Sequence, residues 1–194
     1  MDHAGLALAR VVSSMIPPRQ LPITVCAGSG FNGGDGLAAA RHLHGLGYAV
    51  QVLLTAPASR LTGEPALFAA IVQRLGIPIM EATTSIASSW SSHCAAIVDA
   101  ILGIGARGHV REPAATLIRQ INASGKPVIA ADVPSGLDAD SGSVLGVAVR
   151  ATTTVTFGLP KHGCFLREGP ALTGALLLDP IGFPPQLLAG AGAS

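Results

Sequence analysis

The sequence lacks the charge pattern of a protein that binds nucleic acid or a membrane surface. Only 12% of its 194 residues are charged, the formal net charge is +1, and no block of like charges occurs. A basic patch or tail is the usual electrostatic footprint of such partners. We therefore expect neither nucleic acid nor a membrane as a partner.

Long apolar runs and the signs of a disulfide framework are missing too. No run approaches the roughly 18 apolar residues that a membrane span needs, and the first residues lack the basic-then-apolar order of an export signal. The three cysteines, Cys26, Cys94 and Cys164, are odd in number and share no short spacing. Because disulfides persist in oxidising compartments, this usage predicts a reducing one, and the cytoplasm fits best.

What is present is a chain that is 49% apolar, which is enough for one domain with a full core over residues 1–194. Periodicity and breakers predict helices over 5–15, 37–46, 61–75 and 113–123, and strands over 23–27, 49–54, 77–80, 95–102, 127–133, 152–157 and 175–178. The segment 83–92 is polar and ambiguous. Strands that alternate with helices and are continuously apolar indicate a parallel sheet covered on both faces, an α/β fold.

A glycine-rich segment over 28–36, here called the glycine segment, follows the first predicted strand. It reads Gly-Ser-Gly-Phe-Asn-Gly-Gly-Asp-Gly and contains the spacing G-x-G-x-x-G, which predicts an anion at a helix N-terminus. The acidic residue that would bind a ribose is absent after the next strand, and no Lys follows the glycines as in a phosphate-binding Walker loop. Asn32 and Asp35 instead offer oxygens that suit a cation or hydroxyls. The alternative is that Asp35 caps a helix beginning near Gly36 and that the glycines only form a tight turn.

Two further predicted strands end in carboxylates. Asp99 is followed by a flexible stretch over 103–109, and Asp132 is followed by Pro134 and Ser135. Because ligands bind beyond the carboxyl ends of parallel strands, we expect these groups to meet the glycine segment at one edge. A carboxylate at an apolar strand end is desolvated, and such groups are candidates for acid–base work or cation binding.

Each of these residues also has a structural reading. Asp99 and Asp132 would then be turn or cap residues, and for Asp138 and Asp140 this reading is preferred. Ser135 has no G-x-S-x-G context, so a serine-hydrolase role is not favoured. His42 and His44 do not share a helix face, which argues against a metal site there.

With these segments in view, the chain resembles the YjeF N-terminal domain family, the NAD(P)H-hydrate epimerases. The resemblance rests on the glycine segment, on the stretches 98–105 and 131–138, and more weakly on 2–5, 154–163 and 179–182. It implies a Rossmann-like three-layer αβα sandwich with a mostly parallel central sheet. It also implies interconversion of the R and S forms of hydrated NADH or NADPH, a repair of damaged nicotinamide cofactors.

The resemblance assigns roles to residues at matching positions. Asp132 is expected to carry the catalysis by giving and taking one proton, and a potassium ion is expected on Asn32, Asp99 and Ser135. The substrate is expected to contact Phe31, Asn32, Gly33, Gly34, Asp35, Gly103, Ile104, Gly105, Ala106, Arg107, Gly108, His109 and Asp132.

The chain departs from the family pattern at Phe31, where a second Asn is usual, and at Ile104, where Thr is usual. It also begins about one helix later than family members do, a difference expected to expose apolar surface or alter a homodimer interface. A homodimer and a separate ADP- or ATP-dependent NAD(P)H-hydrate dehydratase are the expected partners. The rival functions are a catalytically silent scaffold of the same fold and an NAD-dependent oxidoreductase.

Overall fold

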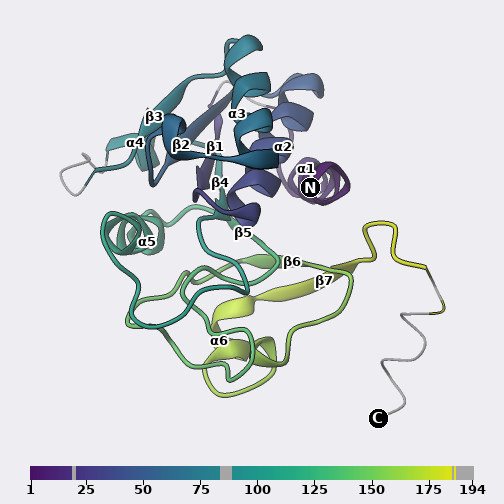
Figure 1. The fold of residues 1–194 in the computed structure, drawn as a ribbon, viewed down its shortest axis with the longest axis vertical. Coiled ribbons are helices and arrows are strands. Elements are labelled where there is room, and N and C mark those ends of the chain that lie inside the picture. Colours follow the sequence, from purple (N-terminus) through teal and green to yellow (C-terminus); the bar gives the residue numbers. More distant parts are fainter. Residues whose placement is uncertain (19–20, 84–88, 185, 187–194) are drawn as a thin grey trace.

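The computed structural model describes residues 1–18, 21–83, 89–184 and 186, and it confirms the α/β Rossmann-like architecture (Figure 1). The central sheet has seven strands in the order β3-β2-β1-β4-β5-β6-β7, and every neighbouring pair is parallel. The strands are β1 (Ile23–Ala27), β2 (Val50–Leu54), β3 (Ile79–Glu81), β4 (Ala96–Ala100), β5 (Val128–Ala131), β6 (Thr153–Phe157) and β7 (Ala175–Asp179). The α-helices are α1 (Asp2–Met15), α2 (Phe31–Gly45), α3 (Gly63–Arg74), α4 (Ser89–Ser92), α5 (Ala114–Ala123) and α6 (Gly169–Thr173), and two 3₁₀ turns, η1 (Ala58–Arg60) and η2 (His162–Cys164), complete the set.

The first strand in the chain lies inside the sheet rather than at its edge. From β1 the chain adds β2 and β3 on one side, and then β4 to β7 on the other. The strand order therefore reverses between β1 and β4. A parallel sheet leaves a crevice at the carboxyl ends of the two strands that flank such a reversal, because the connections leave in opposite directions.

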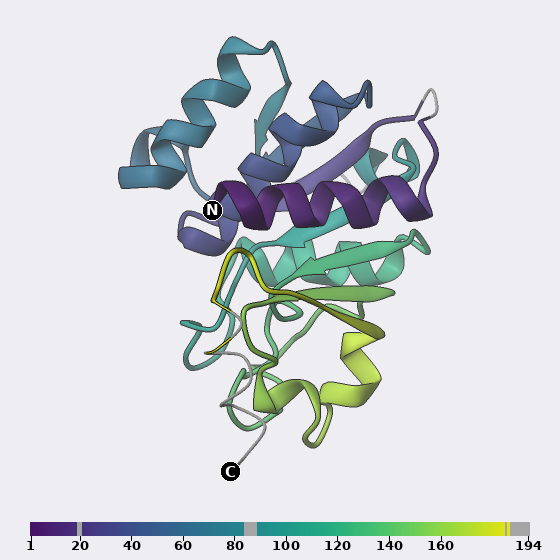
Figure 2. The same cartoon turned by 90° about the vertical axis from the view of Figure 1, so that its right-hand side faces the viewer.

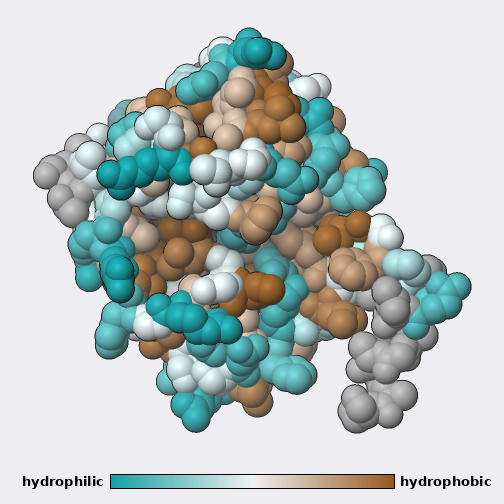
Figure 3. Space-filling view, in the orientation of Figure 1, coloured by the Kyte–Doolittle hydropathy of each residue, from teal (hydrophilic) through white to brown (hydrophobic). Residues whose placement is uncertain are grey.

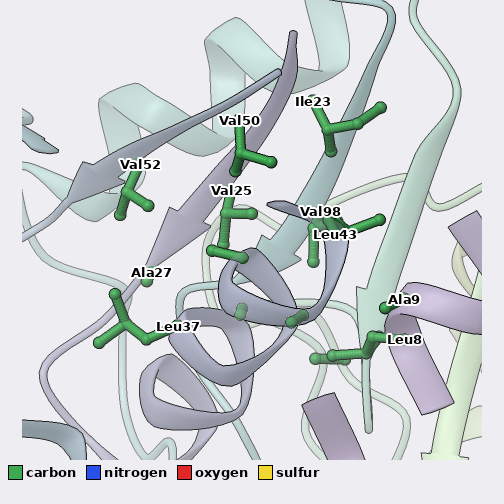
Figure 4. Close-up of a cluster of buried hydrophobic side chains, with 14 of the residues drawn as sticks. Leu8, Ala9, Ile23, Val25, Ala27, Leu37, Leu43, Val50, Val52 and Val98 are labelled. Atoms are coloured by element: carbon green, nitrogen blue, oxygen red, sulfur yellow. The ribbon is translucent and has the colours of Figure 1, made fainter. Parts of the chain in front are cut away.

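The helices cover both faces of the sheet, as predicted. Alternate residues of β1 serve different layers, since Val25 packs into the cluster under α1, α2 and α3 and Cys26 packs into the cluster that contains α5. Figure 4 shows side chains of β1, β2 and β4 directed toward Leu37 and Leu43 of α2. Figure 2 shows α1 lying across the face of the sheet, where it contacts β5 and β6. Burying one such large apolar side chain stabilises the fold by about 1.5–3 kcal/mol.

Helix α2 begins at Phe31, six residues before the predicted start at Leu37, so the prediction of a loop through most of the glycine segment is wrong. Glycine is a poor helix former, and the sequence pattern therefore favours a loop. Packing overrides that propensity, because a Cβ atom on Gly33 would lie 1.9 Å from the carbonyl oxygen of Gly28. The missing side chains let α2 start directly against the end of β1.

Other boundaries differ by a few residues. The predicted helix over 61–75 is α3, which begins at Gly63 and is preceded by the 3₁₀ turn η1. The ambiguous segment 83–92 contains α4, while its residues 84–88 lie outside the described residues. Helix α5 is followed by Gly125 at φ +64°, the left-handed conformation expected beyond a helix end. Within the described ranges, no helix has both the length and the hydropathy to cross a membrane.

Candidate active site at the carboxyl ends of β1, β4 and β5

A cleft of about 600 Å³ opens where the strand order reverses. It is lined by the residues that follow β1, the residues that follow β4, Thr55 after β2, and the carboxylates of α2 and of the turn after β5. The predicted site residues that line it are Phe31, Asn32, Asp35, Gly103, Ile104, Gly105, Ala106 and Asp132. Three segments far apart in the sequence therefore meet at one edge, as their strand-end positions predicted.

The remaining predicted substrate residues lie next to the cleft rather than in its wall. Gly33 and Gly34 are buried within α2. Arg107, Gly108 and His109 line an adjacent cavity of about 480 Å³. The Arg107 guanidinium donates to the carbonyl oxygens of Ile104 and Ala106 and lies 3.4 Å from Asp140, so its hydrogen bonds tie down the 103–109 stretch.

The glycines of the cleft divide into two kinds. A Cβ atom on Gly28 would lie 2.0 Å from the carbonyl oxygen of Ile101, so this glycine is required by packing. Gly30, the N-cap of α2, has no atom within 4 Å of such a Cβ position, and it lines the cleft. The first N–H groups of a helix have no partner inside the helix and carry its positive dipole end. The start of α2 therefore offers donors for an anion beside an unobstructed position.

Asp132 follows β5 in a left-handed conformation, with φ of +66°. Its Oδ1 atom accepts hydrogen bonds from the Phe157 N–H at 3.1 Å and the Thr156 hydroxyl at 3.3 Å, and from the Lys161 ammonium. Its Oδ2 atom accepts no hydrogen bond from the described residues, and Asp132 lines the cleft. One oxygen is thus fixed and the other is available to a ligand.

Lys161 is a residue of the candidate site whose place there the sequence pattern did not indicate. Its Nζ atom donates to Asp132 and, at 2.7 Å, to the Phe157 carbonyl oxygen, and its side chain is 17% exposed. An ammonium in this position stabilises the ionised carboxylate. The weak family-like stretch 154–163 contains Lys161, but nothing in that stretch indicates which carboxylate it reaches.

Asp99 is fully buried at the end of β4 and is held by neutral donors. Ser135 donates to it from its hydroxyl at 2.6 Å and from its backbone N–H at 2.8 Å, and the Ile101 N–H donates at 3.3 Å. Burial raises the pKa of the Asp99 carboxyl to about 6, although these hydrogen bonds lower it in part. Within the described residues, no Lys, Arg or His side chain forms an ion pair with it.

The Asp99 network extends to the cleft through the backbone of Leu102. The Leu102 N–H donates to the Ser135 hydroxyl oxygen at 2.8 Å, and the Leu102 carbonyl oxygen accepts from the Asn32 amide at 3.0 Å. The three residues expected to hold a cation are therefore brought together around Leu102. Ser135 is fully buried and does not line the cleft, so its hydroxyl serves to hold Asp99 and Leu102 and the arrangement gives no support to a nucleophile.

Asp35 lies inside α2 and not at its start, so the alternative that it caps the helix is wrong. Burial, with a smaller contribution from the negative charge of Asp132, raises the pKa of the Asp35 carboxyl to about 7 against the lowering effect of the Met1 amino group. That amino group lies 3.7 Å from the carboxylate. The cleft thus holds two carboxylates, one of which accepts a proton near neutral pH.

The structural readings of other polar residues are confirmed. Asp138 accepts hydrogen bonds from the N–H groups of Asp140 and Ser141, the pattern of a turn, and these bonds lower its pKa. His42 lies 3.0 Å from Asp2 on the surface of α2, and Arg41 reaches the same carboxylate. These groups stabilise the packing of α1 on α2 and lie outside the residues that line the cleft.

Comparisons with known proteins give the chain a family and named relatives. A family model described as "YjeF-related protein N-terminus" matches residues 1–163. The chain is 41% identical over 199 residues to a bifunctional NAD(P)H-hydrate repair enzyme of Pyrobaculum aerophilum, in an alignment that covers 99% of this chain and 39% of the relative. It is 38% identical to an NAD(P)H-hydrate epimerase of Limosilactobacillus fermentum, covering 92% of this chain and 83% of that protein. The chain therefore spans about two fifths of the bifunctional relative.

A solved structure shares the fold over nearly the whole chain. The crystal structure of the yeast protein YNL200c superposes with a TM-score of 0.84 at 25% sequence identity, and the match covers 98% of this chain and 82% of the yeast chain. The overall fold of this chain is therefore shared with a protein whose structure was determined by experiment.

Proposed function

Because this chain belongs to the family of YjeF-related protein N-terminus domains, we propose that it is an NAD(P)H-hydrate epimerase that interconverts the R and S forms of hydrated NADH and NADPH. The bifunctional relative shares 39% of its length with this chain, whereas the relative named for epimerisation alone shares 83%. The activity named for the second relative is therefore the one expected of the segment that this chain covers. The cleft supplies the matching chemistry.

The reaction needs one proton carrier next to the hydrated ring. In the hydrate, a hydroxyl sits on a carbon bonded to the ring nitrogen. Protonation of that hydroxyl lets the C–O bond break with release of water, while the nitrogen lone pair forms a C=N bond. Water then adds to either face of this iminium and loses a proton, which restores the hydrate with either configuration. No electrons are exchanged, so no redox partner is required.

Asp132 is the residue that we assign to this proton transfer. Its fixed Oδ1 and available Oδ2 place a carboxylate of defined orientation in the wall of the cleft. As the carboxylate it takes the proton of the adding water, and as the acid it protonates the leaving hydroxyl. Lys161 holds the carboxylate and compensates its charge. This arrangement is the single observation that carries the proposal.

The start of α2 is the proposed anchor for the diphosphate. Free N–H groups and the helix dipole favour an anion there, and Gly30 leaves room for it. The two charges of a diphosphate bound at this end hold the substrate in a fixed position while the ring reacts at Asp132. The diphosphate is thus bound at one place in the cleft and the ring reacts at another.

A potassium ion fits the residues predicted to hold it. Asn32, Asp99 and Ser135 offer hard oxygen atoms around the Leu102 carbonyl, and the buried Asp99 carboxyl has neutral hydrogen-bond donors as its partners. A monovalent cation bound there would neutralise Asp99 and join the glycine segment to the turns after β4 and β5. These residues support the ion as a structural group rather than as a participant in the proton transfer.

The rival functions are less well supported. A dehydrogenase of this architecture binds the ribose with an acidic residue after the second strand, and Thr55 occupies that region of the cleft. A scaffold has no need of the buried Asp99 network or of a carboxylate held by Lys161. The first observation argues against the oxidoreductase, and the second argues against the scaffold.

Partners and compartment follow from the same proposal. The bifunctional names of the relatives support a second repair step, and we propose an ADP- or ATP-dependent dehydratase as the enzyme that consumes the product. Cys26, Cys94 and Cys164 are free and buried, which supports a reducing compartment such as the cytoplasm.

The test is an NMR assay of the separated R form of hydrated NADH. We expect the protein to bring R and S to equilibrium at a rate far above the uncatalysed one, with no change in the amount of hydrate. Binding without faster interconversion would favour the scaffold. Oxidation of NADH with carbonyl substrates would favour the oxidoreductase.

A further inference from the structure

Epimerisation requires chemistry on both faces of the hydrated ring. The hydroxyl leaves from one face, and the configuration inverts only when water adds to the other face. A carboxyl group transfers a proton at hydrogen-bond distance, so Asp132 serves the face that it contacts. Either the ring rotates about its bond to the ribose between the two steps, or a second proton carrier contacts the opposite face.

The wall of the cleft holds one candidate for a second proton carrier. Among the described residues that line it, Asp35 and Asp132 are the only ones with a titratable side chain. Asp35 lies one helical turn after Phe31, which also lines the cleft, and the Asp35 side chain is 16% exposed. The Asp132 side chain is 13% exposed. Both carboxyls are therefore partly desolvated and still open to a ligand.

The two carboxyls reach the cleft from different sides. Asp132 is held from the side of β6, by Lys161 and by groups at the end of that strand. Asp35 comes from α2, which packs on α1, and the Met1 amino group lies 3.7 Å from its carboxylate. Strand β4 separates β1, which leads into α2, from β5, which leads into Asp132. Because neighbouring strands lie about 4.8 Å apart, the two connections start about 10 Å apart, which leaves room for a ring between them.

The surroundings of the two groups favour opposite protonation states. The Lys161 ammonium and two neutral donors stabilise Asp132 as a carboxylate. Asp35 has its pKa raised to about 7, mainly by burial, and the charges of Asp132 and of the exposed Glu64 act in the same direction while the Met1 amino group opposes them. Near neutral pH, one group is therefore able to give a proton while the other takes one, as an acid and base pair requires.

We propose that Asp35 is a second catalytic residue, which serves the face of the nicotinamide ring opposite to Asp132. This inference rests on the proposed epimerase function. In one direction, the Asp35 carboxyl protonates the hydroxyl, the C–O bond breaks with release of water, and the nitrogen lone pair forms the C=N bond. Water then adds to the opposite face, the C=N electron pair returns to the nitrogen, and Asp132 takes the proton of that water. The reverse reaction moves a proton from Asp132 to Asp35, so each epimer has its own acid.

A pair of proton carriers predicts what each variant retains. Asp35→Asn leaves Asp132 able to remove and restore a hydroxyl on its own face. One epimer then exchanges its hydroxyl oxygen with water and keeps its configuration, whereas the other epimer exchanges none. Asp132→Asn leaves the opposite pattern, because Asp35 serves the other face. A residue that only binds substrate or supports the fold would not produce this division between the epimers.

The test starts from the separated R and S forms of hydrated NADH in water enriched in ¹⁸O. Mass spectrometry measures the label in each form, and NMR measures the configuration. We expect Asp35→Asn to lower the epimerisation rate at least about 100-fold and to retain labelling of one form alone, at a rate above that without protein. Asp35→Glu, which keeps an acid, is expected to epimerise faster than Asp35→Asn.

The matched control is Glu64→Gln. Glu64 is exposed in the first turn of α3, acts on Asp35 through its charge and does not line the cleft. This variant is expected to epimerise at the parent rate. Circular dichroism checks the fold of each variant, and Asp35→Ser repeats the test with a smaller side chain. Titration calorimetry with ADP-ribose, which lacks the ring, is expected to show binding by Asp35→Asn that is no weaker than that of the parent.

The outcomes separate this inference from the proposed function. Epimerisation by Asp35→Asn at the parent rate would overturn the inference and show that the ring rotates past Asp132. Loss of labelling in both epimers would overturn it too, and weaker binding of ADP-ribose by that variant would assign Asp35 to substrate binding instead. The parent is measured first: a parent that does not epimerise contradicts the proposed function and this inference with it, whereas a failure confined to the variants contradicts the inference alone.

Discussion

At the level of single residues, burial decides how the carboxylates around the cleft are protonated. Asp35 and Asp99 both have pKa values raised mainly by desolvation, to about 7 and about 6. An unfolded chain leaves an aspartate pKa near 4. At a pH above about 4 and below these raised pKa values, the Asp35 and Asp99 carboxyls therefore bind more protons in the folded protein than in the unfolded chain.

The effect of Asp35 on stability has a definite sign. Between about pH 4 and pH 7 the folded state holds the Asp35 proton more tightly, so its contribution to the free energy of unfolding falls as pH rises through this window. Asp35→Asn removes that contribution and is expected to be more stable than the parent above pH 7, by up to about 4 kcal/mol. Urea unfolding at several pH values measures the difference.

The control is Asp140→Asn, which removes a carboxylate that is 82% exposed. It should leave the pH dependence of the parent unchanged. A constant difference between Asp35→Asn and the parent from pH 4 to pH 8 would show that the Asp35 pKa is not raised.

The sequence located the site carboxylates but not their partners. Asp99 and Asp132 are predictable because each follows a continuous apolar run, and a parallel sheet brings such strand ends together. Lys161 is not predictable, because its ammonium reaches Asp132 only through the turn after β6, across 29 positions of the chain. The roles of Asp35, Asp99 and Asp132 stay predictions.

At the level of elements, the junction of β1 with α2 positions one wall of the cleft. Gly28 and Gly33 are packed against backbone, whereas Gly30 faces open space. The glycines of one short segment therefore serve different purposes, and substitution distinguishes them.

Gly33→Ala is expected to destabilise the protein by about 1–3 kcal/mol, because the new methyl group meets the Gly28 carbonyl oxygen and the helix must shift. Gly30→Ala is the matched control, since its backbone φ of −91° is accessible to alanine and nothing lies nearby. Thermal and urea unfolding should show a much smaller loss for it. Equal losses in the two variants would contradict the packing role of Gly33.

Element types were predictable, and their ends were less so. The strand predicted over 95–102 ends at Ala100, because the next backbone N–H groups leave the ladder. The Ile101 N–H donates to Asp99 and the Leu102 N–H donates to Ser135. The apolar run continues through both residues, so hydrophobicity alone extends the strand too far. Hydrogen bonds to side chains, one local and one to the distant Ser135, end the strand instead.

At the level of the whole molecule, the connections that follow β1, β4 and β5 meet at the carboxyl ends of the middle strands of the sheet. Figure 3 shows apolar patches across the middle of the face seen in Figure 1, and another near its top. The Asn32, Asp99 and Ser135 group joins all three connections through Leu102. A homodimer stays a prediction, as does the assignment of the compartment.

An ion at that group should stabilise the fold as a whole. We expect potassium to raise the Tm by about 2–5 °C over lithium at equal ionic strength, because an ion that binds only the folded state stabilises it. Asp99→Asn should remove the difference between the two salts. Equal Tm values of the parent in potassium and lithium would contradict the proposed ion.

The most direct test of the account is the epimerisation rate of Asp132→Asn, followed by NMR from the separated R form of hydrated NADH. Asn keeps the shape and loses the proton carrier, so we predict a fall of at least 100-fold with an unchanged fold by circular dichroism. Asp2→Asn, which alters an exposed carboxylate of α1, should retain the parent rate. Epimerisation by Asp132→Asn at the rate of the parent would contradict the central claim that this carboxylate carries the reaction.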